Sequence, residues 1–240
     1  MIKIGILGYG GRMGQAIAQA IAENGTCKVV GGADKHIKPE LAKAEGILVS
    51  SNIDEVVAIS DVVIDFTLAD AVSINVQSAV KHKKAYVCGV TGISAEQIEA
   101  LKQASKTIPV LYTANMSLSL AAMKQIVKLA TKLLGNYDYD IAILDEHHRM
   151  KKDAPSGTAK ALGDAVTETN GGKKQPTYSA TRAGYIVGNH EVAFVGNGEV
   201  IRLHHSVTDR GVFARGAVQA ALWLSGQKPG FYNMDDVLKI

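Results

Sequence analysis

Residues 146–159 of the chain (EHHRMKKDAPSGTA) combine side chains that can transfer a proton with a backbone segment that can bind an anion. His147 titrates near neutral pH and can donate a proton, and Lys151 adds a full positive charge. Ser156 is a favoured helix N-cap, so we expect a helix to begin there and to present backbone N–H groups at residues 157–159. Since a helix N-terminus attracts anions, this segment predicts a pocket for a carboxylate-bearing substrate beside an acid catalyst.

Other interpretations of the same segment remain open. The run HHRMKK at residues 147–152 could be a solvated basic loop, or its two histidines could have no chemical role. These histidines could also bind a metal together with His190, His204 or His205. Zinc sites normally have three or four ligands at a recognisable spacing. Because neither HExxH nor CxxC occurs in the chain, we expect no metal.

A second segment, residues 3–14 (KIGILGYGGRMG), has the pattern of a dinucleotide-binding turn. An apolar strand pattern leads into glycines 8, 11 and 14, and a helix pattern follows, so N–H groups at the start of that helix can bind a pyrophosphate. Asp34 lies twenty positions after Gly14, at the end of another strand pattern. A carboxylate there can accept hydrogen bonds from an adenosine ribose. The alternative is a tight turn that binds nothing.

The choice between the two nicotinamide cofactors rests on the residues around Asp34. The carboxylate favours the free ribose hydroxyls of NADH. Lys35, His36 and Lys38 follow at once and could pair with the 2′-phosphate of NADPH. We therefore predict that both NADH and NADPH are used and that Lys35 is the main phosphate contact.

The first 115 residues alternate short apolar strands with amphipathic helices, which is typical of a parallel sheet with helices on its faces. Strands are predicted at residues 61–66, 86–89 and 110–112, and a helix with a Ser94–Gln97 capping box follows the second of these. Ligands of such sheets bind beyond the carboxyl ends of the strands. The predicted cofactor-binding residues at these ends are Gly8, Tyr9, Gly10, Gly11, Arg12, Met13, Asp34, Lys35, Phe66, Thr67, Gly89, Val90, Thr91, Thr113, Ala114, Asn115 and Met116.

After Asn115 the pattern changes to that of an α+β domain. We predict a helix at 117–134, a strand at 139–146, a helix from Ser156 to about residue 170, and two antiparallel strands around the hairpin signal Asn197-Gly198. A helix at 212–224 then returns to the first domain. The predicted fold class is α/β, a Rossmann-like doubly wound parallel sheet at residues 1–116 plus 212–240, with an inserted α+β domain at residues 117–211.

Composition excludes several other classes. The 240 residues carry a formal net charge of only +3 and show no basic stripe, so we expect no nucleic-acid partner. No apolar run approaches the roughly 18 residues of a membrane span. The chain begins directly with a core strand pattern, which leaves no room for a signal peptide. Cys27 and Cys88 lie in apolar runs and are expected to be buried thiols. We expect a soluble, cytoplasmic protein.

The chain resembles the 4-hydroxy-tetrahydrodipicolinate reductase (dihydrodipicolinate reductase) family of the diaminopimelate and lysine pathway. The resemblance spans the whole chain in the order of the family's motifs, and its histidine-to-alanine motif is highly specific. The segments that carry it are residues 8–14 (GYGGRMG), 65–67 (DFT), 89–92 (GVTG), 115–117 (NMS), 147–159 (HHRMKKDAPSGTA) and 182–194 around His190.

This resemblance implies NAD(P)H-dependent reduction of a cyclic dianionic substrate, with hydride transfer from nicotinamide, proton delivery and loss of water. It implies a homotetramer formed largely through the inserted sheet. It assigns His147 as the proton donor and Lys151 as a second catalytic residue that also binds substrate. The other substrate-binding residues that it implies are His148, Ser156, Gly157 and Thr158.

The chain departs from the family pattern at three positions. Val90 replaces a threonine of the usual Gly-Thr-Thr-Gly loop, Met116 stands where phenylalanine is common, and Ser119 stands where glycine is frequent. These departures concern the packing of the nicotinamide. Two other function classes remain as alternatives: a metal-dependent hydrolase on a Rossmann-like scaffold, and a non-catalytic NAD(P)H sensor.

Overall fold

The structure is a computed structural model that describes residues 1–35 and 46–238. The chain divides into two compact units, and each is described by itself. The larger unit comprises Met1–Met116 and Gly211–Ile240, and the smaller unit comprises Ser117–Arg210. Within the described ranges, no helix is both long enough and apolar enough to cross a membrane.

A seven-stranded parallel sheet forms the centre of the larger unit, in the order β11-β6-β5-β4-β1-β2-β3. The central strands β4 and β5 are buried at every position, as expected where helices cover both faces. The strands are β1 (Ile2–Leu7), β2 (Cys27–Ala33), β3 (Leu48–Ser50), β4 (Val62–Asp65), β5 (Ala85–Cys88), β6 (Pro109–Tyr112) and β11 (Gly230–Tyr232).

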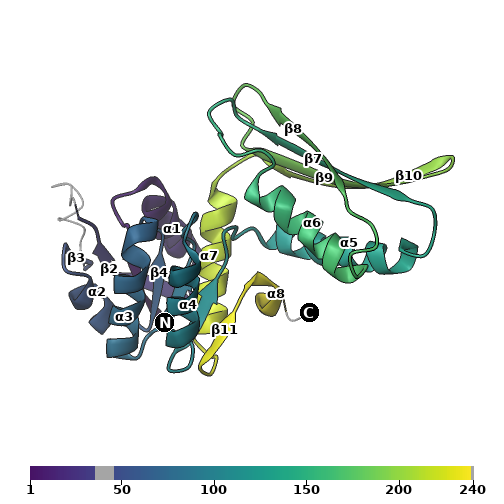
Figure 1. Ribbon diagram of the computed structural model, residues 1–240. Helices are drawn as coiled ribbons and strands as arrows, with labels where there is room; N and C mark the ends of the chain where they lie inside the picture. The colour runs from purple at the N-terminus through teal and green to yellow at the C-terminus, as the bar shows by residue number, and fades with distance from the viewer. Residues whose placement is uncertain (36–45, 239–240) are drawn as a thin grey trace. The chain divides into compact units, whose positions relative to one another are not determined.

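Helices cover both faces of this sheet (Figure 1). Helices α1 and α7 pack against each other on one face, and α2, α3 and α4 form the layer on the other. The predicted capping box is confirmed, since Ser94 caps α4 and Gln97 reaches back to its backbone. The bounds are α1 (Arg12–Asn24), α2 (Ile53–Ile59), η1 (Ala69–Ala71), α3 (Val72–His82), α4 (Ala95–Ala104), α7 (Gly211–Leu224) and α8 (Met234–Val237).

The strand order reverses between β1 and β4, which is the switch point of a doubly wound sheet. Because all seven strands are parallel, the loops that follow β1, β2, β4, β5 and β6 lie at one edge of the sheet. The predicted fold class is confirmed for this unit. Cys27 and Cys88 are buried free thiols, as predicted.

The smaller unit contains a four-stranded mixed sheet in the order β10-β9-β7-β8. Helices α5 and α6 pack together on one face of it (Figure 1). The side chains of Ile141, Ile143, Val192 and Phe194 fill the space beneath them. The elements are α5 (Leu118–Leu134), β7 (Asp140–His147), α6 (Gly157–Thr169), β8 (Thr177–Arg182), β9 (Gly188–Gly196) and β10 (Glu199–Val207).

The hairpin and the two helices of this unit follow the prediction, but β8 was not foreseen. Strands β9 and β10 are antiparallel and meet at Asn197-Gly198, where Gly198 has a φ of +88°. Strand β8 has the sequence TYSATR, is almost entirely exposed and pairs parallel to β7. An edge strand with so little apolar alternation gives no sequence signal. The edge strands β3 and β11 were not predicted either, because three residues are too few to show a periodic pattern.

The tight packing of α7 onto the sheet edge can be tested at Gly216. A Cβ there would overlap the carbonyl oxygen of Met116, so Gly216→Ala is expected to lower the free energy of unfolding by roughly 1–3 kcal/mol. Thermal unfolding should show a Tm lowered by roughly 2–4 °C per kcal/mol. Gly226→Ala is the control, because the nearest described atom to its new methyl is 4.0 Å away. Equal Tm values for the two variants would contradict the packing.

Candidate active site

The buried carboxylate of Asp145 is the centre of the smaller unit's polar site. Alternation along β7 directs Ile141, Ile143, Asp145 and His147 to the same buried face. The side chain of Asp145 is 0% exposed. Since a buried charge is costly unless it is paired, the surroundings of this carboxylate must supply cations or hydrogen-bond donors.

Four groups meet the two oxygens of this carboxylate. Oδ2 accepts hydrogen bonds from the backbone N–H of Ser156 at 2.7 Å and from Nη2 of Arg182 at 2.8 Å. Oδ1 lies 2.8 Å from Nδ1 of His147 and 3.4 Å from Nε2 of His190. Burial raises the pKa of Asp145, but the bonds from Arg182 and Ser156 outweigh it, so its pKa is lowered overall and the group stays charged.

His147 ends β7 with its ring nearly buried. Its Nδ1 atom faces Asp145, and a Cβ on Gly188 would lie 3.1 Å from its Nε2 atom. Burial lowers the pKa of this imidazole; the charge of Asp145 opposes that effect, and Lys151 and Arg182 reinforce it. A histidine whose proton affinity depends on three neighbouring charges suits a proton donor whose charge state responds to a bound anion.

His190 is a different kind of histidine. Its ring meets that of His147 edge-on, with centroids 5.1 Å apart, and its Nε2 lies 3.2 Å from the hydroxyl of Ser156. Burial, followed by the charge of His147, lowers the pKa of His190 to about 4. It is therefore neutral at physiological pH and acts as a packing and hydrogen-bonding neighbour of His147.

The N-terminus of α6 adjoins this carboxylate. Ser156 is buried, and its hydroxyl accepts a hydrogen bond from the N–H of Ala159 at 3.2 Å. The backbone N–H of Ser156 donates to the carboxylate of Asp145. Gly157 is exposed, and among the described residues no atom lies within 4 Å of where its Cβ would be. The helix start therefore has open space in front of its first residue, as an anion-binding site requires.

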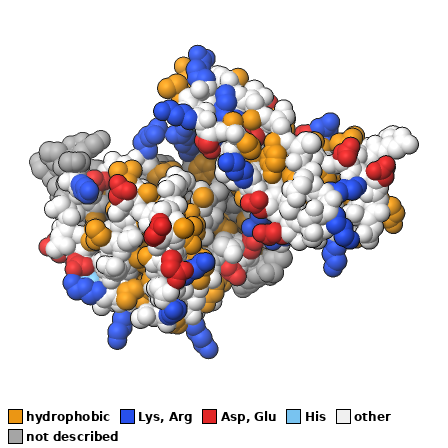
Figure 2. Space-filling model, in the orientation of Figure 1, with side chains coloured by type: hydrophobic (Ala, Val, Ile, Leu, Met, Phe, Trp, Pro, Cys, Tyr) orange, Lys and Arg blue, Asp and Glu red, His pale blue; other side chains and the backbone are white. Residues whose placement is uncertain are grey.

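The loop after β7 carries the remaining predicted substrate residues. It turns immediately, because the N–H of Lys151 donates to the carbonyl of His148 at 3.1 Å. His148 is half-buried, and Lys151 forms an ion pair with Asp153 at 2.8 Å. Figure 2 shows lysine and arginine side chains (blue) gathered over the end of the unit where β7 and β8 finish. This end is electropositive.

In the larger unit, the glycine turn after β1 has the close contacts that its sequence predicts. Gly8 has a φ of +80°, and a Cβ on it would lie 2.9 Å from the carbonyl oxygen of Phe66. A Cβ on Gly14 would overlap the carbonyl of Gly8. Gly11 occupies the N-cap position of α1 and is exposed, and it has no side chain with which to cap the helix. The start of α1 can therefore receive a phosphate.

The end of β2 brings Asp34 to this turn. Its Oδ2 accepts a hydrogen bond from the N–H of Gly10 at 2.9 Å, so the carboxylate sits beside the tip of the glycine turn. Lys35, the next residue in the sequence, is exposed, and so is Arg12 at the end of the glycine turn. His36 and Lys38, which the sequence offered as further phosphate contacts, lie outside the described residues.

A buried carboxylate also holds the loop after β4. Asp65 is 0% exposed and accepts hydrogen bonds from the N–H of Thr67 at 2.8 Å and from its hydroxyl at 2.7 Å. Asn75 at 2.8 Å and the hydroxyl of Tyr86 bind its other oxygen. The ring of Phe66 lies over Gly89, where a Cβ would overlap it. The loops after β4 and β5 are therefore packed together at the edge of the sheet.

The predicted cofactor residues differ in what they can offer a ligand. Tyr9, Val90 and Met116 are 4%, 3% and 1% exposed, so their side chains belong to the interior and only their backbone atoms can reach a ligand. Thr91 and Ala114 are exposed. The hydroxyl of Thr113 accepts a hydrogen bond from the N–H of Asn115 at 3.2 Å and shapes the loop after β6.

Two residues of the smaller site, Asp145 and Arg182, received no role from the sequence, which offered His190 only as a candidate metal ligand. The one available signal was the alternation of β7, which places an acid at a core position. Asp145, His147 and His190 have ligand atoms within 4.8 Å of one another and could in principle bind a metal. The guanidinium of Arg182 already forms an ion pair with Asp145 and would repel the double charge of a divalent metal ion at these atoms.

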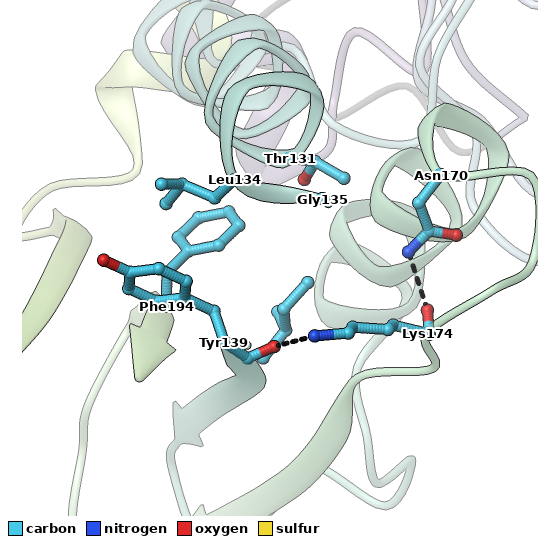
Figure 3. Close-up of a pocket in the computed structure, with 8 residues that line it drawn as sticks. Thr131, Leu134, Gly135, Tyr139, Asn170, Lys174 and Phe194 are labelled. Carbon is cyan, nitrogen blue, oxygen red and sulfur yellow. Dashed lines mark hydrogen bonds between the residues drawn. The ribbon is translucent and has the colours of Figure 1, made fainter. Parts of the chain in front are cut away.

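A small cavity lies at the opposite end of β7 (Figure 3). The end of α5, the loop after α6 and the ring of Phe194 line it, and Lys174 donates a hydrogen bond to the carbonyl of Tyr139 at 2.9 Å. Its volume of about 10 Å³ has room for roughly one water molecule. It is too small for an organic substrate and is separate from the site at His147.

The doubly wound sheet with its glycine turn and Asp34, together with the buried histidine–carboxylate centre, defines a Rossmann-fold oxidoreductase. Family models described as dihydrodipicolinate reductase, N-terminus, and dihydrodipicolinate reductase, C-terminus, match residues 2–116 and 119–238. The chain belongs to the dihydrodipicolinate reductase family.

Curated relatives and a solved structure agree with this membership. The 4-hydroxy-tetrahydrodipicolinate reductase of Caldanaerobacter subterraneus is 40% identical, covering 100% of this chain and 99% of the relative. That of Methanocorpusculum labreanum is 41% identical and covers 99% of both chains. A dipicolinate-bound dihydrodipicolinate reductase from Paenisporosarcina has the same fold, with a TM-score of 0.83 at 20% identity over 98% of this chain and 99% of that one.

The open space at the start of α6 can be tested with Gly157→Ala. The added methyl meets no described atom of the protein, and alanine is a better helix former than glycine by up to about 1 kcal/mol, so Tm should be unchanged or higher. The methyl would occupy the space proposed for an anion. We expect the Kd for a small aromatic dicarboxylate, measured by calorimetry, to rise about tenfold, or about 1.4 kcal/mol. Gly226→Ala is the matched control, and unchanged dicarboxylate binding by Gly157→Ala would exclude this helix end as the anion site.

Proposed function

We propose that this protein catalyses the NAD(P)H-dependent reduction of 4-hydroxy-tetrahydrodipicolinate to tetrahydrodipicolinate, a step of diaminopimelate and lysine biosynthesis. The relatives that carry this name match over their full length. The observation that carries the proposal within this chain is the pairing of His147 with Asp145 beside the open N-terminus of α6. A proton donor next to an anion site is what reduction of a carboxylate-bearing ring requires.

In this proposal the residues of the smaller unit bind the substrate and supply the proton. One substrate carboxylate lies against the N–H groups of Gly157 and Thr158, where the dipole of α6 favours negative charge. Lys151 exchanges its ion pair with Asp153 for a substrate carboxylate, and His148 adds a further contact. Ser156 holds the helix start in place through its hydroxyl cap.

The reaction balances with a single proton from the protein. NAD(P)H, when bound, supplies a hydride to a ring carbon of the substrate. His147 delivers the proton that accompanies loss of the 4-hydroxyl group as water, and its imidazole is reprotonated from solvent. Asp145 and Lys151 set the charge around His147, so that the protonated ring can form at neutral pH beside a dianionic ligand.

The larger unit is proposed to bind the cofactor at the carboxyl edge of its sheet. The start of α1 and the turn at Gly10–Gly11 would hold the pyrophosphate, and Asp34 the adenosine ribose. Lys35 would pair with the 2′-phosphate of NADPH. Phe66, Thr67 and the loops after β5 and β6 would surround the nicotinamide.

A homotetramer assembled through the smaller unit's sheet is part of the proposal. Helices α5 and α6 cover one face of that sheet, and the other face carries Leu144, Val195 and Val200, of which the last two are 38% and 45% exposed. Burial of this face against other copies would explain its apolar side chains.

A cytoplasmic location is also proposed, since the buried free thiols of Cys27 and Cys88 suit a reducing compartment.

A coupled assay tests the proposed activity directly. The substrate is generated in situ from pyruvate and aspartate semialdehyde by the preceding synthase, and oxidation of NADPH or NADH is followed by absorbance. We expect turnover that depends on both precursors and is unaffected by a chelator. A sensor would bind NAD(P)H without turnover, and a metal-dependent hydrolase would lose its activity with the chelator.

Removal of the proton donor should reduce turnover far more than binding. His147→Gln keeps a polar side chain of similar size but cannot donate a proton as imidazolium. We expect kcat in the coupled assay to fall by roughly 10²–10⁴-fold. His82→Gln, at the end of α3 in the other unit, is the control and should retain wild-type kcat. A His147→Gln enzyme with normal kcat would remove this residue from the chemistry.

Lys35→Ala tests the proposed choice of cofactor. Loss of an exposed cation that pairs with a 2′-phosphate should reduce kcat/KM for NADPH about tenfold and leave that for NADH unchanged, which corresponds to about 1.4 kcal/mol. Raised ionic strength should also reduce kcat/KM for NADPH in the wild type, because salt screens the attraction between Lys35 and the 2′-phosphate. Lys28→Ala, exposed near the start of β2, is the matched control. An unaltered NADPH/NADH ratio in the Lys35 variant would show that the phosphate contact lies elsewhere.

A further inference from the structure

We propose that Asp145 is a positioning residue that joins the anion site at the start of α6 to the proton donor His147. The inference rests on the proposed function and assigns a role to a residue that contacts neither the substrate nor the cofactor in that proposal. Its basis is the geometry of a single carboxylate shared between a helix N-terminus, a guanidinium and an imidazole.

The two oxygens of Asp145 face different parts of the site. Oδ2 accepts from the N–H of Ser156 and from Arg182, at 2.7 and 2.8 Å, and so attaches the start of α6 and the end of β8 to β7. Arg182 also donates to the carbonyl of Asp153 in the loop between β7 and α6. Oδ1 faces His147 and His190, at 2.8 and 3.4 Å. One side chain therefore sets the position of the anion site relative to the catalytic ring.

The same contact selects the tautomer of His147. Neither Nδ1 of His147 nor Oδ1 of Asp145 has an aligned hydrogen bond among the described residues, so their 2.8 Å approach is an electrostatic contact. A carboxylate oxygen at this distance is attractive if Nδ1 carries a proton and repulsive if it presents a lone pair. Nδ1 is therefore the protonated nitrogen of the neutral ring, which leaves Nε2 to receive and donate the catalytic proton. Gly188 lies on the Nε2 side, and the absence of a side chain at that residue keeps this nitrogen accessible.

The charges around His147 come from every element packed against it. Asp145 on β7 stabilises the imidazolium, whereas Arg182 at the end of β8 and Lys151 in the loop after β7 destabilise it. His190 on β9 is neutral at physiological pH. A substrate carboxylate that neutralises Lys151 would remove one of the two opposing charges. Binding of the dianion would then raise the pKa of His147, so that its ring is protonated before the reaction begins.

Two substitutions that change this charge balance in opposite directions test the proposal. Asp145→Asn removes the negative charge and should lower the pKa of His147 by about 1–3 units. Arg182→Gln removes a positive charge and should raise it. Asp140→Asn, the same chemical change at the exposed start of β7, should leave it unaltered.

The pKa is measured by NMR titration of the His147 ring in the full-length protein without substrate, with the resonance assigned from His147→Gln. The ring ¹⁵N shifts should report the Nδ1–H tautomer in the wild type and its loss in Asp145→Asn. In the coupled assay, the basic limb of the kcat/KM profile should move with the NMR value. Asp145→Glu keeps the charge and should retain a pKa near that of the wild type.

The outcomes separate this role from a purely structural one. If Asp145→Asn and Arg182→Gln leave the His147 pKa and tautomer unchanged, the proposal is overturned. If Asp145→Asn does not fold, the upward shift in Arg182→Gln and the retained pKa in Asp145→Glu decide the question, and absence of the shift overturns the proposal. A wild type without turnover would contradict the proposed function, while the NMR result would still decide whether Asp145 controls His147.

Discussion

A charged carboxylate buried between β7, β8 and α6 is the constraint on which the smaller unit depends. Asp145 can remain charged in the interior because Arg182 and the N–H of Ser156 compensate it at hydrogen-bond distance. Removal of one partner from such a buried pair typically costs about 3–5 kcal/mol. The pairing therefore holds together three consecutive elements of the chain, and it does so where the proposed proton donor and the proposed anion site meet.

The larger unit uses the same device in a different form. Asp65, also buried, is surrounded by neutral donors on Thr67, Asn75 and Tyr86, and it shapes the loop after β4 at the switch point of the sheet. In both units a carboxylate at or near the end of a strand orders the loop that follows. These loops carry the residues proposed to bind ligands, so the carboxylates act on function through the backbone that they fix.

Much of the architecture was predictable from local patterns. Continuous apolar runs and glycine turns predicted the parallel sheet, the serines at 94, 117 and 156 predicted helix starts, and Asn197-Gly198 predicted the hairpin. Each of these signals acts over a few residues, so one sequence suffices to detect it. Strand β8 could not be found in this way, because its exposed polar residues are held by pairing with β7 rather than by their own propensity.

The sequence by itself determined which groups are available: a titratable histidine, a lysine, a capped helix start, a glycine turn and an acid after the second strand. The tertiary structure alone decided that Tyr9, Val90 and Met116 turn their side chains into the interior. It also decided that Asp145, Arg182 and His190 surround His147. The physical reason is distance along the chain: Arg182 and His190 lie on two other strands, and only the packing of the sheet brings their charge and hydrogen-bonding groups to the ring.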